Sequence, residues 1–438
     1  MAHVIKNIIE ATLPASWFQK IVSSYHFLLT WVGAILNDFP ARQLLIVGVT
    51  GTKGKTTVTE MINAILEEAA CKTCLINSIR FKIGDTSEKN RTRMSMPGRF
   101  FIQRFLRRAL REGCSVAIIE MTSEGARQHR HRCTEMDALV FLNLAPEHIE
   151  SHGSYQNYAD AKFELARELL RSRKRPRIIV ANADDAAAMR YLTLPVENIL
   201  PFSLSISKPF AADERGGYFT FEENRIEVDM PGEFSLKNAI AAATLARAVG
   251  ISKESIKKAL ERFGGIPGRI ERLEAGQDFT VIIDYAHTPD SLSALYESFT
   301  HMKKICVLGA AGGGRDVWKR PTMGRIAEKE CAAVILTNED PFDENPQKIV
   351  EDIARGMTKP PTVYIDRREA IAKALEIALG WSEDTRSPET QGKSGIAVLI
   401  TGKGSESSIA GAKGSTVPWS DTQVAREELQ RLLKSLAV

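Results

Sequence analysis

Residues 44–57 read LLIVGVTGTKGKTT, and this stretch decides the fold. Its first residues form an apolar run typical of a β-strand, its middle is a glycine-rich turn, and a segment suited to a helix follows at 58–70. A strand, a glycine-rich loop and a helix in this order are typical of a phosphate-binding loop, because backbone N–H groups and the helix N-terminus attract an anion. The stretch therefore predicts a site for a phosphate.

The polar residues of this loop add metal and phosphate chemistry. Lys55 can reach terminal phosphates, and Thr56 can offer a hydroxyl to Mg²⁺. The usual pattern G-x-x-x-x-G-K-[ST] is missed by one place, because Val49 stands where its first glycine is expected and Gly48 lies one residue too early. A glycine- and threonine-rich turn without a ligand is the alternative interpretation.

Length and composition indicate a globular protein of two or three domains. The chain has 438 residues, of which 44% are hydrophobic and 26% charged. Its formal net charge is +4, with both signs mixed along the chain, so the composition gives no case for nucleic acid as a partner. The basic runs at 105–111 and 171–177 are interpreted as a solvated helix face and a connection between a helix and a strand.

Cysteine usage favours a reducing compartment. Six cysteines are scattered along the chain and no secretory signal peptide precedes them, which is typical of a cytoplasmic protein. Cys71 and Cys74 have the spacing of half a zinc site or of a redox pair. No second pair accompanies them, so they are expected to be ordinary buried thiols.

The segment 1–43 is predicted to form two short amphipathic helices. Its large apolar residues are spaced for one face: Trp17, Phe18, Phe27, Leu28, Trp31 and Ile35. The uncharged stretch 21–37 is short and polar for a membrane span, so a packed helix is expected and no stable membrane insertion, with peripheral membrane contact as the alternative.

From residue 44 onwards, strand-like and helix-like segments alternate. Strands are expected at 116–120, 138–142 and 178–181, a hairpin around Glu223 and Asn224, and helices at 99–112, 159–171, 235–249 and 252–263. The glycines and proline of 264–269 indicate a boundary, after which five further strand candidates lie at 280–287, 304–316, 332–341, 362–366 and 396–404. Residues 382–395 are expected to form a mobile loop.

The predicted fold is therefore α/β. A helical segment at 1–43 precedes a central domain at 44–265, which has a mostly parallel sheet of the phosphate-loop type. A Rossmann-like α/β domain follows at 266–438.

Three polar residues near strand ends are candidates for chemistry. Glu120 ends a strand and could share an Mg²⁺ with Thr56, although a surface carboxylate would look the same. His148 and His152 lack a zinc motif, and a loop histidine is often structural. Lys162, taken alone, is a solvated lysine on a helix.

Motifs from about residue 44 to 429 give the chain a family resemblance. They are GVTGTKGKTT (48–57), MSMPGR (94–99), EMTSEGARQHR (120–130), LNLAPEHIESHGSYQNYADAK (142–162), and then IPGRIE, DYAHTPDSL, KRPTMG, DPFDENP and GKGSE in order. In these motifs the chain resembles the Mur ligase superfamily, and most closely the MurE type, which adds the third amino acid to a UDP-N-acetylmuramoyl dipeptide.

The resemblance implies an ATP-dependent ligase with two Mg²⁺ ions. An acceptor carboxylate would take the γ-phosphoryl group to give an acyl phosphate, which the amine of a free amino acid then attacks. The implied catalytic residues are Lys55, Glu120, His148 and Lys162. Thr56 and Glu120 would hold the first ion, and His148 and Lys162 the second, with Lys162 carboxylated so that it offers oxygen ligands.

The implied binding residues fall into three groups. ATP would contact Gly51, Thr52, Lys53, Gly54, Lys55, Thr56, Thr57, Asn238, Arg269 and Asp284. A nucleotide-linked peptide acceptor would contact Met96, Pro97, Ser123, Gln128 and Arg130, and the amino acid Asp340, Pro341, Gly402 and Glu406. Domain closure would complete the ATP site, and the enzyme is expected to be a cytoplasmic monomer.

Departures from the family pattern concern the substrates. The family has a larger N-terminal domain that grips the UDP, so the 43 residues before the loop strand are expected to be a reduced substitute or a docking surface for a partner. Phe342 stands where enzymes selecting diaminopimelate carry an arginine, and Glu406 could accept an ammonium group, which favours lysine or ornithine. Phe342 could instead merely pack, with selectivity decided elsewhere.

Two further alternatives stay open at the level of sequence. The same chemistry could act on another acceptor, as in relatives that extend folate, build poly-amino acids or assemble pseudomurein. The chain could also be a non-catalytic subunit. The retained motif residues argue against it, namely Lys55, Thr56, Glu120, His148 and Lys162. The motifs offer no firm role for Glu124, which replaces the family's histidine.

Overall fold

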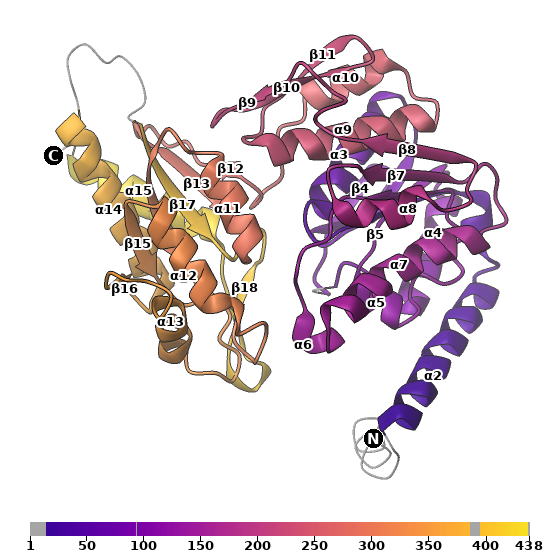
Figure 1. The fold of residues 1–438 in the computed structure, drawn as a ribbon, viewed down its shortest axis with the longest axis horizontal. Coiled ribbons are helices and arrows are strands. Elements are labelled where there is room, and N and C mark those ends of the chain that lie inside the picture. The colour runs from indigo at the N-terminus through magenta and orange to yellow at the C-terminus, as the bar shows by residue number, and fades with distance from the viewer. Residues whose placement is uncertain (1–14, 93, 386–394, 437–438) are drawn as a thin grey trace. The chain divides into compact units, whose positions relative to one another are not determined.

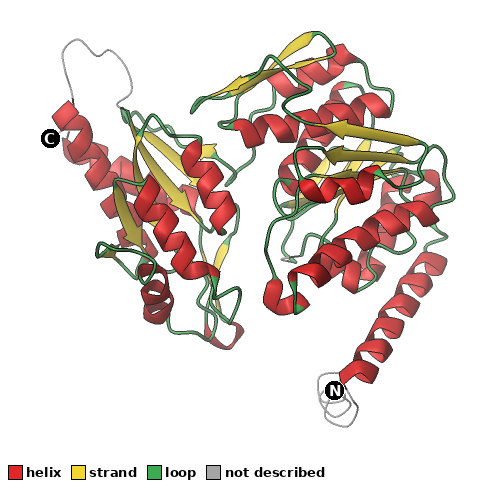
Figure 2. Ribbon diagram, in the orientation of Figure 1, coloured by secondary structure: helices red, strands yellow, loops and turns green. Residues whose placement is uncertain are grey.

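The computed structural model describes residues 15–92, 94–385 and 395–436 (Figure 1). These residues form two compact units. The first unit contains the described residues up to 144 together with 154–207 and 238–260, and the second contains 145–153, 208–237 and the described residues from 261. Each unit is an α/β structure, with strands gathered into a sheet and helices packed against it (Figure 2).

The first unit is built on an eight-stranded sheet in the order β4-β3-β2-β5-β1-β6-β7-β8. The strands are β1 (Leu45–Thr50), β2 (Thr73–Ile76), β3 (Arg80–Ile83), β4 (Thr86–Lys89), β5 (Val116–Glu120), β6 (Ala138–Phe141), β7 (Ile178–Asn182) and β8 (Asn198–Phe202). Only β3 and β4 run antiparallel to their neighbours. The predicted mostly parallel sheet is confirmed, and β1 lies at its centre between β5 and β6.

The helices of the first unit follow the strands in sequence. They are α2 (Ala15–Leu36), α3 (Lys55–Glu68), α4 (Arg99–Arg111), α5 (Ser123–Arg127), α7 (Tyr155–Arg171), α8 (Met189–Leu192), most of α9 (Glu233–Ala248) and α10 (Lys253–Glu261), with short 3₁₀ turns at Pro40–Gln43 and Ala186–Ala188. Helix α3 starts at Lys55, directly at the loop and three residues before its expected beginning.

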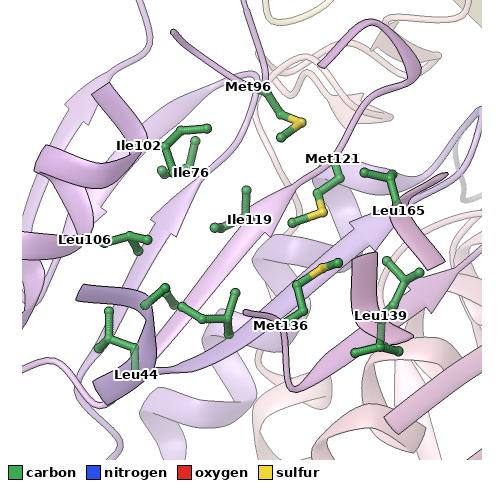
Figure 3. Close-up of a cluster of buried hydrophobic side chains, with 14 of the residues drawn as sticks. Leu44, Ile76, Met96, Ile102, Leu106, Ile119, Met121, Met136, Leu139 and Leu165 are labelled. Carbon is green, nitrogen blue, oxygen red and sulfur yellow. The ribbon is translucent and has the colours of Figure 1, made fainter. Parts of the chain in front are cut away.

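A cluster of buried side chains fills one face of this sheet (Figure 3). Close packing there explains the irregular glycine of the loop strand. A Cβ built on Gly48 would lie 2.8 Å from the sulfur atoms of both Met121 and Met136, which are fully buried. Gly48 is therefore required by packing beneath the loop, because a larger residue would force these buried side chains to move.

The second unit contains a six-stranded sheet in the order β12-β13-β17-β14-β15-β16. Its strands are β12 (Glu271–Arg272), β13 (Thr280–Asp284), β14 (Lys303–Leu308), β15 (Ala333–Leu336), β16 (Thr362–Val363) and β17 (Ile396–Thr401). All pair in parallel except β12. The helices are α6 (Ile149–His152), α11 (Pro289–Glu297), α12 (Lys319–Glu330), α13 (Pro346–Ala354), α14 (Arg367–Thr385) and α15 (Asp421–Leu436), with a 3₁₀ turn at Ala412–Gly414.

Two small antiparallel sheets complete the second unit. One joins β9 (Ala211–Ala212), β10 (Gly217–Phe221) and β11 (Asn224–Val228), and the other β18 (Ser408–Ala410) and β19 (Thr416–Pro418). The predicted hairpin is confirmed, because Glu222 and Glu223 form the turn between β10 and β11, with φ angles of 44° and 68°.

Two predicted segments differ from the structure. The described part of the N-terminal segment holds one helix of 22 residues, α2, in place of two short ones, because no breaker interrupts 15–36; the start of the predicted pair lies outside the described residues. Helix α14 continues to Thr385 and so includes the start of the expected loop, the rest of which lies outside the described residues.

Several large apolar residues of α2 are exposed, although a packed helix was expected. Phe27, Leu28, Trp31 and Ile35 are all among the exposed large hydrophobic residues. The helix contacts the first unit through smaller residues instead, because its buried positions are Thr30, Gly33 and Ala34. In the part of the chain that the structure describes, no helix is long and apolar enough to cross a membrane.

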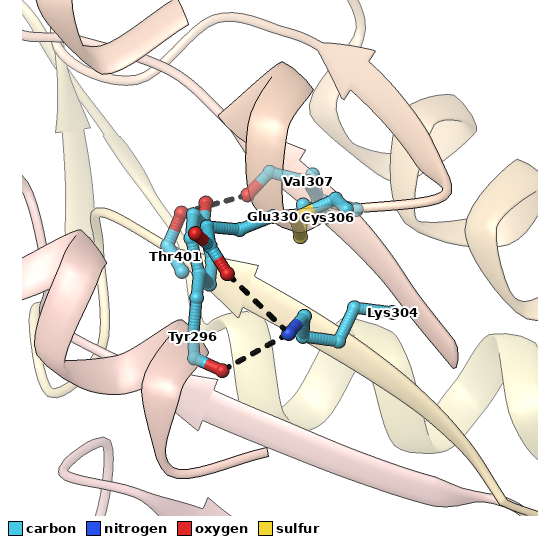
Figure 4. The surroundings of a disulfide bond; sticks show 7 residues. Tyr296, Lys304, Cys306, Val307, Glu330 and Thr401 are labelled. Atoms are coloured by element: carbon cyan, nitrogen blue, oxygen red, sulfur yellow. Dashed lines mark hydrogen bonds and ion pairs between the residues drawn. A yellow bond between two sulfur atoms is a disulfide. The ribbon is translucent and has the colours of Figure 1, made fainter. Parts of the chain in front are cut away.

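One pair of cysteines is oxidised. Cys306 in β14 forms a disulfide with Cys331, which directly follows α12, with a Cα–Cα distance of 6.2 Å (Figure 4). Beside this bond Lys304 donates to the Tyr296 carbonyl at 3.2 Å. Cys71 and Cys74 are free thiols as expected, but only Cys74 is buried, and Cys71 is partly exposed. The bond could not be predicted from the sequence, because 25 residues separate the two cysteines and only the parallel pairing of β14 and β15 brings them together.

Reduction should therefore destabilise the second unit. Closing a loop of this length stabilises a fold by about 3 kcal/mol, so a reductant should lower the free energy of unfolding by about that amount. Thermal and denaturant unfolding with and without a phosphine reductant measures the effect. The double variant Cys306→Ser/Cys331→Ser should lose the response to reductant, whereas Cys71→Ser should keep it. Alkylation of all six cysteines in unreduced, denatured protein would contradict the bond.

Candidate functional site

The phosphate loop connects β1 to α3, and its glycine at the helix start is sterically required. Gly54 precedes α3 with a φ of 82°, which favours glycine. A Cβ at this position would also lie 2.4 Å from Oδ1 of Asn238. Asn238, predicted from α9 as an ATP contact, therefore lies directly against the loop.

Asn143 fixes the backbone of the loop. Its side-chain oxygen accepts hydrogen bonds from the N–H groups of Thr52 and Lys53 at 3.0 and 2.8 Å, and its amide donates to the Lys53 carbonyl at 3.1 Å. Sequence reasoning missed this residue. The available signal was its place directly after the buried strand β6, inside a motif that was quoted for other residues.

Lys55 turns back over the loop that precedes it. Its ammonium group donates to the carbonyls of Gly51 and Thr52 at 3.1 and 2.9 Å. The positive charge is thus held above the glycine-rich turn, where phosphate oxygens are expected.

Thr56 and Glu120 are in direct contact. The Thr56 hydroxyl donates to Oε2 of Glu120 at 2.9 Å, and the backbone N–H of Ser78 donates to the same oxygen at 3.0 Å. The Ser78 hydroxyl, which the sequence did not single out, lies 2.9 Å from the Thr56 hydroxyl. These oxygens fit Mg²⁺, which prefers one or two carboxylates and hydroxyls beside substrate phosphates.

Lys162 is buried, which corrects its interpretation as a solvated lysine. Only 2% of its surface is exposed, and its ammonium donates to the Gly51 carbonyl at 2.6 Å. The ammonium also lies 4.8 Å from the ring centre of Tyr158, whose hydroxyl is 2.9 Å from that of Thr52. Lys162 therefore reaches the phosphate loop from α7, and as an ammonium it would oppose a metal ion there.

The predicted ligands of a second ion belong to different units, with Lys162 in the first and His148 in the second. Within residues 15–92, 94–385 and 395–436, no three or more histidine, cysteine and carboxylate side chains are grouped so as to hold a metal. The two Mg²⁺ sites implied by the resemblance also use Thr56 and a carboxylated Lys162, and neither residue type belongs to such a group of side chains. The number of ions and the carboxylation of Lys162 stay predictions.

The residues predicted for the acceptor form one cluster in the first unit. Arg130 donates to the Gln128 side chain at 2.6 Å and also to the Met96 carbonyl. Burial lowers the pKa of Arg130, and the charge of Glu124 opposes this shift. Pro97 and Ser123 are both buried in the same unit.

Glu124 gains a role from the structure. Its carboxylate accepts a hydrogen bond from the Gln128 amide at 2.6 Å, and Arg127 lies 3.5 Å away. Glu124 therefore orients the Gln128 side chain, which in turn accepts a hydrogen bond from Arg130.

In the second unit, His148 lies at a strained turn held by a carboxylate. Its φ is 57°, and its backbone N–H and that of Ile149 donate to the two oxygens of Asp316 at 3.0 and 3.1 Å. The neighbouring Glu147 lies 3.3 Å from Nε2 of His287. Asp316 thus sets the position of the loop that carries the predicted metal ligand.

Arg269 and Asp284 also come together in the second unit. The Arg269 guanidinium lies 4.0 Å from the ring centre of Tyr285, and its Nε is buried without a hydrogen-bond partner among the described residues. Burial raises the pKa of Asp284, and the charge of Arg269 opposes this shift. Asp284 accepts from the N–H groups of Ile270 and Ala286 at 2.9 and 2.7 Å.

The residues predicted for the amino acid surround a buried lysine. Lys403 has no exposed surface, lies 2.8 Å from Oδ2 of Asp340 and forms an ion pair with Glu406. Glu406 also accepts from the Tyr285 hydroxyl at 3.0 Å. The charge of Glu406, expected to await an ammonium group, is thus already balanced by Lys403.

Gly402 and Pro341 lie at close backbone contacts beside this lysine. Gly402 has a φ of 107°, and a Cβ there would lie 2.4 Å from Oε2 of Glu339. The Pro341 carbonyl carbon would lie 2.8 Å from a Cβ on Gly312. The two glycines therefore let the strand-end loops approach one another.

Arg315 is a charged residue that the sequence analysis missed. Its guanidinium carbon lies 4.5 Å from the ring centre of Phe342, the residue that stands in place of the family's arginine. It belongs to the glycine-rich run after β14, and this run after a strand end was the available signal. A guanidinium therefore lies beside this motif position, although the residue at the position itself is apolar.

Comparison with known families gives two matches along the chain. Residues 49–246 match the Mur ligase middle domain, and residues 268–404 match the Mur ligase glutamate ligase domain. Together the two matches cover most of the chain.

Comparison with individual proteins gives similar relatives over nearly the whole chain. A UDP-N-acetylmuramoyl-L-alanyl-D-glutamate–2,6-diaminopimelate ligase of Gloeobacter violaceus is 35% identical, over 97% of this chain and 84% of the relative. A UDP-N-acetylmuramyl-tripeptide synthetase of Roseiflexus is 36% identical, over 92% and 81%. A solved UDP-N-acetylmuramoyl-L-alanyl-D-glutamate–2,6-diaminopimelate ligase superposes with a TM-score of 0.59 at 26% identity, over 89% and 79%.

Removing the charge of Glu120 should weaken binding of Mg²⁺ with the nucleotide. In Glu120→Gln the Thr56 hydroxyl keeps an acceptor but the ion loses a carboxylate, so affinity for ATP with Mg²⁺ should fall at least roughly tenfold. Titration calorimetry with Mg²⁺ and with EDTA measures this. Glu223→Gln, in the exposed hairpin turn, is the matched control and should bind normally. Equal affinity of Glu120→Gln and the unaltered protein would refute the metal role.

Glu339 should make stability depend on pH. Burial raises its pKa from 4.5 to about 7, and Lys403 opposes this only in part. The Glu339 carboxyl therefore binds a proton more tightly in the folded state than in the unfolded state. This tighter binding stabilises the fold fully at pH values below the pKa of the unfolded chain, and the stabilisation is lost as the pH rises through about 7.

Glu339→Gln should accordingly raise the free energy of unfolding at pH 8 by about 1 to 3 kcal/mol and leave it nearly unchanged at pH 5. Denaturant unfolding at both pH values measures this difference. The exposed Glu369→Gln should show no such dependence. A variant destabilised equally at both pH values would mean that the ionised carboxylate has a role in the fold.

Proposed function

Because the chain belongs to the Mur ligase family, whose members are ATP-dependent ligases that form amide bonds, we propose that it adds an amino acid to a UDP-N-acetylmuramoyl dipeptide during peptidoglycan precursor synthesis. The observation that carries the proposal is the contact of Thr56 with Glu120 beside the loop that carries Lys55. The names of relatives at 35% and 36% identity support the acceptor.

The residues of the loop would act on the phosphates of ATP. Lys55 would neutralise charge on the terminal phosphates, and the backbone fixed by Asn143 would present N–H groups to them. Thr56 and Glu120 would hold Mg²⁺, which supplies further positive charge to the transferring phosphoryl group. Asn238 would contact the adenine, Arg269 a phosphate and Asp284 the ribose.

The reaction proceeds in two steps under this proposal. The acceptor carboxylate attacks the γ-phosphorus, the bond to the bridging oxygen breaks, and ADP leaves behind an acyl phosphate. The amine of the incoming amino acid then attacks the acyl carbon, and inorganic phosphate leaves as the amide forms. Arg130, which donates hydrogen bonds to the Gln128 side chain and the Met96 carbonyl, would hold the acceptor for the first step.

Two candidates for the added amino acid rest on different residues. Phe342 favours lysine or ornithine, because a phenyl ring cannot bind a distal carboxylate. Arg315 favours diaminopimelate, because its guanidinium lies 4.5 Å from that ring and could bind such a carboxylate, and because Glu406 is already paired with Lys403.

An ADP-release screen tests the function and the choice together. UDP-linked and unlinked acceptors are crossed with lysine, ornithine and diaminopimelate, with Lys55→Ala as a control that should lose at least roughly a hundredfold in rate. ADP release with a UDP-linked dipeptide is expected. Release only with unlinked acceptors would move the activity to another acceptor, and equal activity of Lys55→Ala would indicate a non-catalytic subunit.

The variant Arg315→Gln decides between the two amino acids. If Arg315 holds a distal carboxylate, the KM for diaminopimelate should rise at least roughly tenfold while the KM for lysine changes little. Arg355→Gln, on an exposed arginine after α13, is the matched control. Preference for lysine that Arg315→Gln leaves unchanged would assign selectivity to Phe342.

A further inference from the structure

Helix α2 presents an apolar stripe to solvent. Leu28, Trp31 and Ile35 lie along one side of the helix at intervals of three and four residues, and they are 60%, 42% and 59% exposed. Tyr25, Phe27 and Leu36 flank them, so six of the fifteen exposed large hydrophobic residues in the part of the chain that the structure describes belong to this one helix. No lysine, arginine, aspartate or glutamate occurs between 21 and 37. Such a concentration marks an interaction surface.

The opposite side of α2 is fixed to the first unit. The Thr30 hydroxyl donates to the His129 carbonyl at 3.1 Å, the Ser23 hydroxyl lies 2.7 Å from Nε2 of His129, and Gly33 and Ala34 are buried. The Phe27 ring also meets the His129 ring edge-on at 5.9 Å. The helix is thus held in place by its polar and small residues, and the apolar stripe is presented on a fixed support.

A basic face on α4 borders α2. The two helices are in contact. Arg107 of α4 lies 3.5 Å from Asp38, just after α2. Arg104, Arg108 and Arg111 are exposed and follow at intervals of four and three residues, so they form one face of α4. The nearest carboxylate to Arg108 is Glu88, at 4.0 Å.

This basic face also rims an aromatic groove of about 330 Å³. Its floor includes the rings of Phe81, Phe101 and Phe105, and Arg104 and Arg108 line it beside them. The first two ring centres are 4.8 Å apart. The groove beside the arginines of α4 therefore combines positive charge with an apolar lining, and Glu88 also lines it.

We propose that α2 and α4 bind this protein to the surface of an anionic lipid bilayer. Tryptophan and tyrosine beside leucine and isoleucine suit the boundary between headgroups and acyl chains, and the arginines of α4 suit lipid phosphates. A second copy of the chain fits less well, because a symmetric contact would bring the same arginine face close to itself. Under this proposal α2 lies in the boundary between headgroups and acyl chains without crossing the bilayer, because the side of α2 opposite the apolar stripe is bound to the first unit.

Vesicle co-sedimentation tests the proposal on the full chain. Vesicles of phosphatidylcholine with phosphatidylglycerol should bind the protein, and vesicles of phosphatidylcholine alone should bind it at least roughly tenfold more weakly. Leu28→Ser/Trp31→Ser/Ile35→Ser should lose binding at least tenfold, and so should Arg104→Gln/Arg108→Gln/Arg111→Gln on the anionic vesicles. Met189→Ser/Ile206→Ser, at exposed apolar positions elsewhere in the same unit, is the matched control and should bind normally.

Three results would overturn the proposal. The first is that the unaltered protein does not bind anionic vesicles, and the second is that the triple serine variant still binds them. The third is light scattering that shows a dimer for the unaltered protein and a monomer for that variant, which would make the stripe a contact between copies. Unfolding curves check that the variants fold. ADP release without vesicles should be unchanged in all of them, so a failure of the proposed ligase activity is distinguished from a failure of membrane binding.

Discussion

The hold of Asn143 on the phosphate loop is the constraint on which the first unit's site depends. One side chain accepts from two consecutive N–H groups, of Thr52 and Lys53, and donates to the carbonyl of the second. A glycine-rich turn loses much conformational entropy when it is ordered, and such bonds compensate for part of that loss. Lys162 adds a further bond to the Gly51 carbonyl, so two distant parts of the chain determine the shape of one short loop.

Sheet topology then brings the remaining groups to this loop. Strand β1 pairs in parallel with β5 on one side and β6 on the other, so the ends of all three strands lie at the same edge. Glu120 ends β5 and Asn143 follows β6, and both therefore reach the loop after β1. The same packing requires Gly48 beneath the loop, where two methionine sulfur atoms leave no space for a side chain.

Buried charged residues gather around Lys403 in the second unit. Lys403 is fully buried and paired with Asp340 and Glu406, while Glu339 lies beside it with its pKa raised to about 7 by burial. Burying an unpaired ammonium group would cost several kcal/mol, so the carboxylates of Asp340 and Glu406 are needed to stabilise Lys403 in this position. On α2, by contrast, apolar side chains remain in solvent on a helix that small and polar residues hold in place.

The sequence by itself determined the alternating α/β order and the strand-loop-helix around Lys55, because apolar periodicity and local motifs report on neighbouring residues. Only the tertiary structure decided that Lys162 is buried, that Ser78 and Asn143 support the site, that Arg315 lies over Phe342 and that Cys306 bonds to Cys331. Each of these depends on strand order and packing between distant segments. The exposure of the apolar stripe on α2 could not be predicted for the same reason, because the sequence of an amphipathic helix does not show which side of that helix the rest of the fold covers.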